Sequence, residues 1–444
     1  MVAPLKVGLA GIGTVGAAVI QLIAKGDGLA ARCGRPVEVV AVCARTKGKD
    51  RGVDLSKLRW FDDPVALAKD PGIDVFVELM GGDGDPAKAA IEAALKSGKA
   101  VVTANKALLA RHGLALAELA EENGVALNFE AAVGGAIPVV KILREGLAGN
   151  SFARIYGILT GTCNYILTRM EQDKLSFAEC LKDAQRLGYA EADPTFDVEG
   201  YDTAQKLAIL ASIAFGITVD PDAIYVEGIS SIQPADLAAA DELGYRIKLL
   251  GVAMKTDSGI EQRVHPTMVP KDSAIAQVMG VTNAVTLDAE GISPITLVGP
   301  GAGGMATASA VVADIGDVAR GVRVSPFGRA AKSLTVTGKA PMQMHEGGYY
   351  IRLLAVDKPG TAATIATRLA EQQISLESIV QRHLVTPDSG PQGGKDAKAA
   401  TGPVPVILIT YATTEDAVRR ALDAVKADKV ISGEPQLIRI EKNR

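Results

Sequence analysis

Cysteine and histidine are scarce in this sequence of 444 residues, which contains four of each. The cysteines show no C-x-x-C spacing, and the histidines are scattered along the chain. Disulfide frameworks and structural zinc sites need such residues clustered at short, regular spacings. Their absence argues against both, and we expect reduced thiols in a cytoplasmic protein.

Long apolar runs and concentrations of basic charge are also missing. No apolar run is long enough to cross a bilayer, and the N-terminus lacks the charged and apolar regions of a secretory signal. The net charge is −4 with a pI near 5.8, and there is no run rich in lysine and arginine. We therefore expect neither a membrane nor a nucleic acid as a partner.

Apolar residues, by contrast, are abundant and make up 48% of the sequence. A chain of this length and composition can bury large cores and predicts about two or three domains of roughly 150 residues each. We expect a multidomain globular protein.

A glycine-rich turn lies between an apolar strand and an apolar-periodic helix within residues 5–25. The turn has the pattern G-x-G-x-x-G and consists of Gly11, Ile12, Gly13, Thr14, Val15 and Gly16. In a dinucleotide site the glycines allow the tight turn, the approach of the pyrophosphate and close packing of helix on strand. The helix N-terminus then offers N–H donors to the phosphates. This position favours dinucleotide binding over a glycine turn that has no ligand.

The residues after the second expected strand, Val37–Val42, bear on the choice of dinucleotide. An acidic residue at this strand end would bind the 2′-hydroxyl of NAD, whereas an arginine can receive the 2′-phosphate of NADP. Here the strand runs into Cys43-Ala44-Arg45-Thr46-Lys47, without an acid. The sequence favours NADP over NAD, with Arg45 as the phosphate contact. The alternative is that Arg45 only points into water.

Two further strands and two helices complete the expected α/β domain, a Rossmann-type doubly wound parallel sheet. These segments are Val75–Met80, Pro86–Ser97, Ala100–Ala104 and Leu108–Glu122. Ligands of such sheets bind beyond the carboxyl ends of the strands. We therefore expect Thr103 and Lys106 near the nicotinamide end of the cofactor, although a lysine there can also be a solvated charge.

The stretch Arg186–Leu210 has an unusual order of charges. Five carboxylates precede a single lysine and an apolar helix: Glu191, Asp193, Asp197, Glu199 and Asp202, then Lys206. Asp202 and Lys206 are four residues apart and share one face of a helix. Such a pair could bind a small zwitterion while offering a proton. The alternative is an ordinary surface ion pair worth roughly 0.3 kcal/mol.

Four further segments, together with the glycine turn, carry a resemblance to a known family. They are T-A-N-K at 103–106, E-A-A-V-G-G-A-I-P at 130–138, G-I-L-T-G-T-C-N-Y-I-L at 157–167, and L-G-Y-A-E-A-D-P followed by D-x-E-G-x-D-x-x-x-K at 187–206. Over about residues 5–325 the sequence resembles homoserine dehydrogenase. The resemblance implies a nucleotide domain at 1–150 completed by about 300–340, and an α+β substrate domain at 151–300.

The resemblance also implies roles for individual residues. Lys206 matches the catalytic acid/base, and Lys106 matches the family's second lysine near the reacting carbon. Glu191 and Asp202 match the acids that hold the substrate, and Gly188 lies in the same motif.

Two more segments match family sites for small ligands. The oxygens of Glu130, Val133, Gly135 and Ile137, largely backbone, match a site for sodium or another monovalent cation. The glycine-rich stretch with Gly303 and Gly304 matches a late return of the chain that closes over the cofactor.

The C-terminal residues 345–444 predict a separate ferredoxin-like βαββαβ module. Its expected elements are a strand at Tyr349–Val356, a helix at Thr361–Gln373, strands at Ile374–Gln381 and Val404–Thr410, a helix at Thr414–Ala427 and a strand at Gln436–Ile440. The insert Pro387–Pro403 is expected to be a mobile loop.

This module resembles an ACT domain, which implies amino-acid sensing and pairing with a second subunit. Because ferredoxin-like sheets have edge strands that are usually covered, we expect a homodimer or homotetramer. Asp357 and Gly360 lie where such modules often meet an effector, and threonine is the effector that the family implies. The alternative is that the D-x-P-G turn is only structural.

The leading hypothesis is NAD(P)-dependent interconversion of L-homoserine and L-aspartate 4-semialdehyde, regulated through the C-terminal module. An alternative of another class is a non-catalytic sensor of nucleotide and amino acid. A third hypothesis is a dehydrogenase that acts at an amine carbon. Only the first predicts oxidation of NADPH with aspartate semialdehyde.

Overall fold

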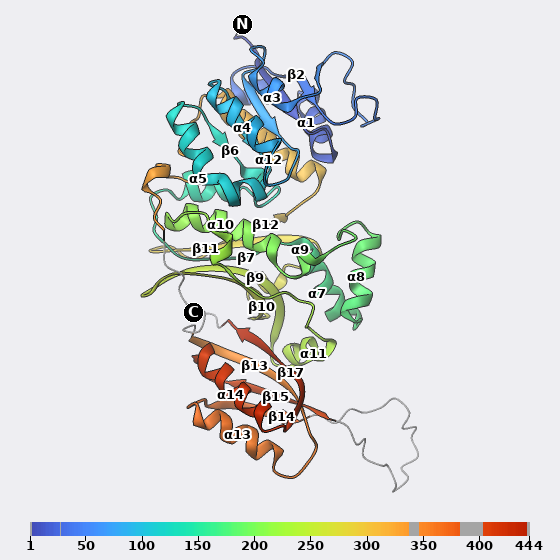
Figure 1. Cartoon of the computed structure of the whole chain (residues 1–444), viewed down its shortest axis with the longest axis vertical. Helices are drawn as coiled ribbons and strands as arrows, with labels where there is room; N and C mark the ends of the chain where they lie inside the picture. Colours follow the sequence, from blue (N-terminus) through green and yellow to red (C-terminus); the bar gives the residue numbers. More distant parts are fainter. Residues whose placement is uncertain (1, 27, 337–345, 382–402, 442–444) are drawn as a thin grey trace.

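The computed structural model describes residues 2–26, 28–336, 346–381 and 403–441. Three parts follow one another along the long axis of the molecule: an N-terminal α/β part, a middle part built on a mixed sheet, and the C-terminal module (Figure 1). All four cysteines are buried and unpaired, as predicted. Within the described ranges, no helix has the length and apolarity that crossing a membrane requires.

The N-terminal part is the predicted doubly wound sheet. Its six parallel strands have the order β3-β2-β1-β4-β5-β6, which is typical of dinucleotide-binding folds. The elements are β1 (Leu5–Ala10), α1 (Thr14–Lys25), α2 (Leu29–Cys33), β2 (Val37–Cys43), β3 (Arg59–Phe61), α3 (Pro64–Lys69), β4 (Val75–Glu78), α4 (Ala87–Lys96), β5 (Ala100–Thr103), α5 (Lys106–Glu122) and β6 (Leu127–Asn128).

Helix α5 begins two residues earlier than the sequence predicted. The side chain of Asn105 accepts a hydrogen bond from the backbone N–H of Leu108 at 3.1 Å and so caps the helix. Lys106 is therefore the first residue of α5 and not part of a loop after the strand. This start fixes the lysine on a rigid element.

The middle part has a mixed sheet, in which β12-β11-β7-β9-β10 pair antiparallel in this order and the short β8 pairs in parallel with β10. Its elements are η1 (Glu130–Ala132), α6 (Val139–Lys141), η2 (Ile142–Gly146), β7 (Phe152–Ile158), α7 (Gly161–Asp173), α8 (Phe177–Arg186), α9 (Thr195–Val198), α10 (Tyr201–Phe215), η3 (Pro221–Ala223), β8 (Tyr225–Val226), α11 (Pro234–Glu242), β9 (Tyr245–Thr256), β10 (Gly259–Pro270), η4 (Ile275–Gln277), β11 (Thr282–Ala289) and β12 (Ile295–Pro300). Helix α12 (Gly304–Ala319) then returns to pack on α1, and η5 (Ala331–Ser333) follows.

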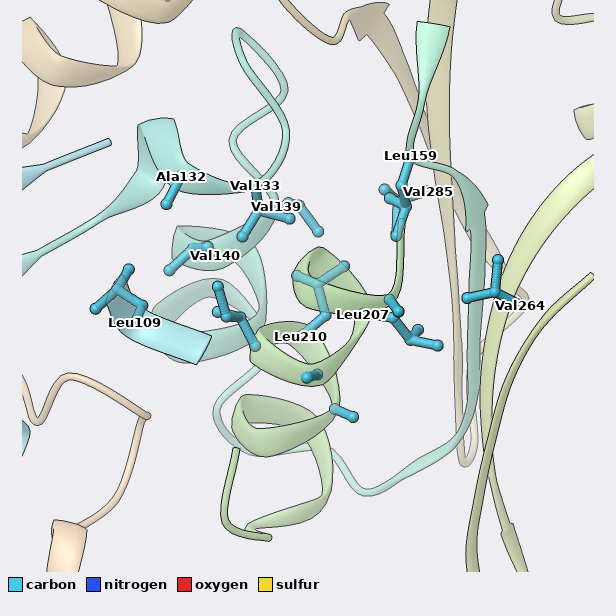
Figure 2. Packing of buried hydrophobic residues seen from close by; sticks show 14 of the residues in the cluster. Leu109, Ala132, Val133, Val139, Val140, Leu159, Leu207, Leu210, Val264 and Val285 are labelled. Carbon is cyan, nitrogen blue, oxygen red and sulfur yellow. The ribbon is translucent and has the colours of Figure 1, made fainter. Parts of the chain in front are cut away.

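Helix α10 is the centre of the molecule. It lies between α5 and the mixed sheet, and Leu207 and Leu210 pack among apolar side chains of both parts (Figure 2). Asp202 and Thr203 are buried on the same helix. A helix with burial on most of its faces belongs to a core and not to a surface. The interpretation of Asp202 and Lys206 as a solvated surface pair is therefore wrong.

The C-terminal module has the predicted βαββαβ order. Its antiparallel strands follow the order β17-β13-β15-β14, and its two helices contact each other. The elements are β13 (Glu346–Ala355), α13 (Thr361–Glu371), β14 (Leu376–Gln381), β15 (Val404–Thr410), β16 (Thr413–Thr414), α14 (Glu415–Ala427) and β17 (Ile431–Ile440). The predicted mobile insert lies outside the described residues except for Pro403.

The module has an apolar core of its own, but its sheet is joined to the sheet of the middle part. Strand β17 pairs in parallel with β10, with Arg439 opposite Thr267 and Ile440 opposite Met268. The N–H of Glu441 donates to the carbonyl of Met268 at 2.9 Å. One sheet of 11 strands therefore runs through the middle part and the module. The C-terminal end of β17 is thus paired within the same chain, at Arg439 and Ile440.

Buried ion pairs fasten the module to the middle part. The Asp236 carboxylate on α11 is fully buried and accepts hydrogen bonds from Nε and Nη2 of Arg352 at 2.6 and 3.1 Å and from the Tyr350 hydroxyl at 2.9 Å. Arg439 bonds both Glu415, at 2.8 and 2.6 Å, and Glu227 of the middle part. Such charge-assisted bidentate contacts fix geometry as well as adding energy.

Replacing Asp236 with alanine should leave the Arg352 guanidinium buried without its counter-ion. We expect the free energy of unfolding to fall by roughly 3–5 kcal/mol, measured as a shift of the urea-unfolding midpoint with unchanged slope. Asp241→Ala is the matched control, because Asp241 lies on the same helix but forms an exposed pair with Lys271. Its effect should stay below about 1 kcal/mol. Equal effects of the two variants would contradict the buried-pair argument.

Candidate functional site

The Asp202 carboxylate joins two lysines from different parts of the molecule. Its Oδ2 accepts from Nζ of Lys206 at 2.7 Å, one turn further along α10. Its Oδ1 lies 3.2 Å from Nζ of Lys106, the first residue of α5. The predicted catalytic lysines and one predicted substrate-binding acid thus form a single cluster between the nucleotide and substrate parts, with Asp202 buried and Lys106 one-third exposed.

Further hydrogen bonds hold Lys206 in one orientation. Its Nζ donates to the Leu159 carbonyl at 2.8 Å, and the Thr160 hydroxyl donates to Asp202 Oδ2 at 2.7 Å. Both partners follow the end of β7 in the chain. An ammonium group has three donors, so two are used and one remains for a substrate oxygen. The Lys206 side chain is only 12% exposed, which keeps bulk water away from it.

Opposing effects set the pKa of Asp202. Burial alone raises it, but Lys206, Lys106 and the hydrogen bonds outweigh burial and lower it from 3.8 to about 2. Asp202 is therefore ionised at neutral pH and holds both lysines by charge.

Asp197 is a second acid of this region that sequence reasoning left without a role. Its carboxylate accepts from the Thr162 hydroxyl at 3.0 Å. Burial and the negative charge of Asp202 raise its pKa, while Lys206 and Lys106 act in the opposite direction. Its place in the D-x-E-G-x-D motif was the signal that could have identified it.

Glu78 is another buried acid that the sequence did not single out. It ends β4, and its carboxylate accepts from the N–H groups of Met80 and Gly81 at 2.6 and 3.1 Å. The Thr103 hydroxyl donates to its other oxygen at 2.7 Å. Thr103 also accepts from the N–H of Asn105 at 3.0 Å. Thr103 thus shapes the strand ends beside Lys106 and is fully buried.

The glycine turn has the geometry that a dinucleotide needs. Gly11 has a φ of +96°, and a Cβ there would collide with the Leu79 carbonyl. Gly13 has open space where a side chain would stand, so a phosphate can approach the backbone. Gly16 would collide with Gly11 if it had a Cβ, which explains the third glycine. Ile12, Gly13 and the start of α1 line a cavity of about 690 Å³.

Two helix N-termini meet at this cavity. Helix α1 starts at Thr14, followed by Val15, and α12 starts at Gly304, with Gly303 before it. Neither start has a side-chain cap, so both retain free N–H donors. A Cβ at Gly304 would lie 2.8 Å from Cγ2 of Thr14. The structure thus brings the two predicted glycine segments together, although about 290 residues separate them in the chain.

Two arginines follow β2, and they differ in exposure and in hydrogen bonding. Arg45 is exposed after the strand end. Arg51, which sequence reasoning missed, donates to the carbonyls of Ile12 and Thr46 at 3.0 and 2.5 Å and lines the same cavity. Arg51 therefore fastens the loop over the glycine turn, whereas Arg45 remains available to a ligand.

The remaining predicted substrate residues lie at the surface. Gly188 and Glu191 are exposed in the segment between α8 and α9. Gly188 has a φ of +78°, which favours glycine there. The backbone carbonyl of Glu191 accepts from Gln185 at 3.0 Å. Among the described contacts, none joins the Glu191 carboxylate to either lysine.

The predicted cation segment forms a tight loop against the start of α6. The Glu130 carboxylate accepts from the N–H groups of Val140 and Lys141 at 2.9 and 2.8 Å, so its side chain serves as a helix cap. Burial and the neighbouring Asp314 raise its pKa to about 7. Among the described residues no three His, Cys, Asp or Glu side chains converge on a metal position. Any cation here depends on backbone oxygens.

Those backbone oxygens come from a compact turn. Val133 and Ile137 are buried, and the Ile137 carbonyl accepts from Val139 at 2.8 Å. Gly135 has a φ of +60° and presses against the backbone of Gly301. The loop therefore also joins the segment that leads into α12.

The predicted effector residues lie at the start of α13. Gly360 has a φ of +92° and precedes the helix, and Asp357 is exposed. The turn has the predicted form, and the N–H of Val356 beside it donates to Val430 of the same module at 2.9 Å.

Asp202→Asn should change stability in a pH-dependent way. The folded pKa of Asp202, about 2, lies below its ordinary value of 3.8. Its contribution is thus fully present above pH 3.8 and is lost as the pH falls through about 2. Urea midpoints should differ between wild type and variant by a constant amount from about pH 5 to 8.

Below about pH 4 that difference should shrink. Asp173→Asn is the control, since Asp173 forms an exposed i,i+4 pair with Arg169 and should show little difference at any pH. A gap between wild type and Asp202→Asn that widens on acidification would refute the assignment.

Comparison with known proteins agrees with this geometry. Residues 11–130 match the model of the homoserine dehydrogenase NAD-binding domain, and residues 138–315 match that of homoserine dehydrogenase. Homoserine dehydrogenase of Pseudomonas aeruginosa is 44% identical, over 99% of each chain.

Solved structures agree as well. A homoserine dehydrogenase structure from Thiobacillus denitrificans is 40% identical with a TM-score of 0.90, over 99% of this chain and 98% of that one. A hyperthermophilic archaeal homoserine dehydrogenase in complex with NADPH is 26% identical with a TM-score of 0.61, over 71% of this chain and 97% of that one. The chain belongs to the homoserine dehydrogenase family.

Proposed function

We propose that this enzyme interconverts L-homoserine and L-aspartate 4-semialdehyde with NADP as preferred cofactor and NAD as the alternative. The observation that carries the proposal is the Asp202 carboxylate between Lys206 and Lys106, at the junction of the nucleotide and substrate parts. A nicotinamide cofactor supplies or accepts the hydride when bound. A non-catalytic sensor would have no need of a lysine whose ammonium group is held by two fixed partners and keeps one donor unused.

Lys206 acts as the proton donor when the aldehyde is reduced. Its one unused N–H donates to the carbonyl oxygen of the aldehyde, where negative charge develops as the hydride arrives. In the reverse reaction the same amino group accepts the proton of the homoserine hydroxyl. Asp202 and the Leu159 carbonyl hold the ammonium in place. Lys106 stands on the opposite side of Asp202 and adds positive charge beside the reacting carbon.

Glu191, on the exposed segment before α9, and Asp202 hold the substrate, as the family match implies. Asp197, whose carboxylate is coupled to the charges of Asp202 and both lysines, is a further acid for the substrate's ammonium group. Gly188 allows the turn that carries Glu191. The family match favours this reaction over that of a dehydrogenase acting at an amine carbon.

The monovalent cation belongs to the backbone oxygens of Glu130, Val133, Gly135 and Ile137. Its role would be structural, since this loop packs on the segment leading to α12: the N–H of Ala136 donates to the Pro300 carbonyl at 3.1 Å. An ordered loop there supports the α12 start at the cofactor cavity.

The C-terminal module is proposed to be ACT-like and to regulate the enzyme through an amino acid, with threonine the first to test. The turn at Asp357–Gly360 is the effector position that the sequence predicts. The β14 edge of the long sheet is the position for pairing in a homodimer or homotetramer, because β14 is the last strand of the sheet on the side of the module.

Lys206→Ala should lower kcat by roughly 10²–10⁴ fold, because a positioned proton donor contributes about that much. The assay is NADPH oxidation with aspartate semialdehyde. Lys206→Arg keeps the charge beside Asp202 but releases a proton poorly, so it should also be slow. Lys182→Ala, on the exposed side of α8, is the control and should leave kcat unchanged. Near-normal turnover of both Lys206 variants would remove this residue from the mechanism.

Arg45→Ala should raise the KM for NADPH by about tenfold and the KM for NADH much less, because it removes a partner of the additional phosphate. Arg51→Ala is the comparison variant. Since Arg51 fastens the loop over the glycine turn, its replacement should weaken the binding of NADPH and NADH to a similar extent. If Arg45→Ala raised the KM values for NADPH and NADH by a similar factor, this residue would support the loop instead.

A further inference from the structure

A groove of about 640 Å³ lies where the middle part meets the C-terminal module. One wall contains Glu199 and Tyr201, immediately before and at the start of α10. The opposite wall contains Arg352 of β13 and Arg419 of α14. The groove therefore lies between the catalytic helix and the proposed regulatory module.

Charged groups with unused hydrogen-bonding capacity line both walls. Arg352 uses Nε and Nη2 on Asp236, which leaves its Nη1 without a described partner. Arg419 uses Nε and Nη2 on Glu415, and Nη2 also contacts the Tyr225 hydroxyl and the Glu227 carboxylate, which leaves Nη1 without a described partner. On the facing wall, the Glu199 carboxylate has no hydrogen bond or ion pair within the described parts of the chain. Donors for an anion and an acceptor for a cation thus share one groove.

We propose that this groove binds a small α-amino acid, whose carboxylate is held by Arg352 and Arg419 and whose ammonium is held by Glu199. The chemistry matches a zwitterion, because guanidinium groups pair well with carboxylates and a free carboxylate pairs with an ammonium. The serine hydroxyls of Ser230 and Ser231, also in the groove, can meet a polar side chain.

This site deepens the regulation proposed above and moves it away from the Asp357–Gly360 turn. A ligand in the groove would contact the catalytic part directly. At the turn, by contrast, Val356, which precedes Asp357, bonds to Val430 within the module. A ligand that touches both walls loses contacts if the walls move apart, so its affinity differs between the two arrangements of the groove. Such a difference in affinity is what coupling between the groove and the catalytic site requires.

The groove is tightly connected to the catalytic cluster. A Cβ at Gly228 would collide with the Glu199 side chain, and one at Gly200 would lie 2.9 Å from Cγ1 of Val264. Glu199 therefore packs closely on Gly228, and Gly200 packs closely on Val264 of β10. Asp202, which holds both lysines, follows only three residues after Glu199. A ligand bound to Glu199 thus acts on the first turn of α10.

The test is calorimetric binding to the full chain with L-threonine, L-serine and L-alanine as probes, accompanied by the dehydrogenase assay. N-acetyl-L-threonine, which lacks the ammonium, serves as the ligand-side control. Glu199→Gln removes the proposed ammonium acceptor with little change in shape. Ser231→Trp fills the groove without removing a charged contact. Ser258→Trp, in the exposed hairpin between β9 and β10, and Asp357→Ala, at the sequence-predicted turn, are the matched controls.

We expect at least one of the three amino acids to bind and to change the rate, and N-acetyl-L-threonine not to bind. Glu199→Gln should weaken binding by at least about tenfold, and Ser231→Trp should abolish it while dehydrogenase activity remains. Ser258→Trp and Asp357→Ala should bind as the wild type does.

Two results would overturn the proposal that the groove binds an amino acid. One is loss of binding in Asp357→Ala with binding retained in Ser231→Trp, which would place the site at the turn. The other is an active enzyme to which none of the three amino acids binds. Absence of dehydrogenase activity in the wild type would instead count against the proposed function, so the two failures are distinguishable.

Discussion

The ion pairs of Asp202 set the central constraint on this structure. A buried carboxylate is costly unless charges and hydrogen bonds compensate it, and here two lysines and the Thr160 hydroxyl do so. Because Lys206 lies on α10 and Lys106 on α5, the cluster is complete only when the nucleotide and substrate parts are docked. The same interactions that lower the pKa of Asp202 thus hold Lys206 next to the nucleotide part.

Packing around α10 supplies the rigidity that this cluster needs. The helix is buried against α5 on one side and the mixed sheet on the other, so its polar first turn cannot relax into water (Figure 2). Beside it, Glu78 and Thr103 fix the ends of β4 and β5 through buried hydrogen bonds. The uncapped starts of α1 and α12 complete the arrangement with free N–H donors at the cofactor cavity.

The long sheet ties the C-terminal module to this centre. Backbone pairing of β17 with β10 and the buried pair of Arg352 with Asp236 join the two parts (Figure 1). A rearrangement at either contact would change both the module and the middle part, because each contact has one partner in each of them. This connection is the physical basis on which an effector of the module could influence catalysis.

The sequence by itself determined the elements whose signals are local. The glycine pattern, the strand and helix periodicities of the N-terminal sheet, the βαββαβ order of the module and the spacing of Asp202 from Lys206 all depend on neighbouring residues, and the structure has them. Only the tertiary structure decided that Lys106 reaches Asp202, that Arg51 covers the glycine turn and that Glu78 organises two strand ends. It also decided that β17 continues the β10 edge. These contacts join residues far apart in the chain, and no periodicity or turn chemistry encodes which strand edge or which charge will meet another.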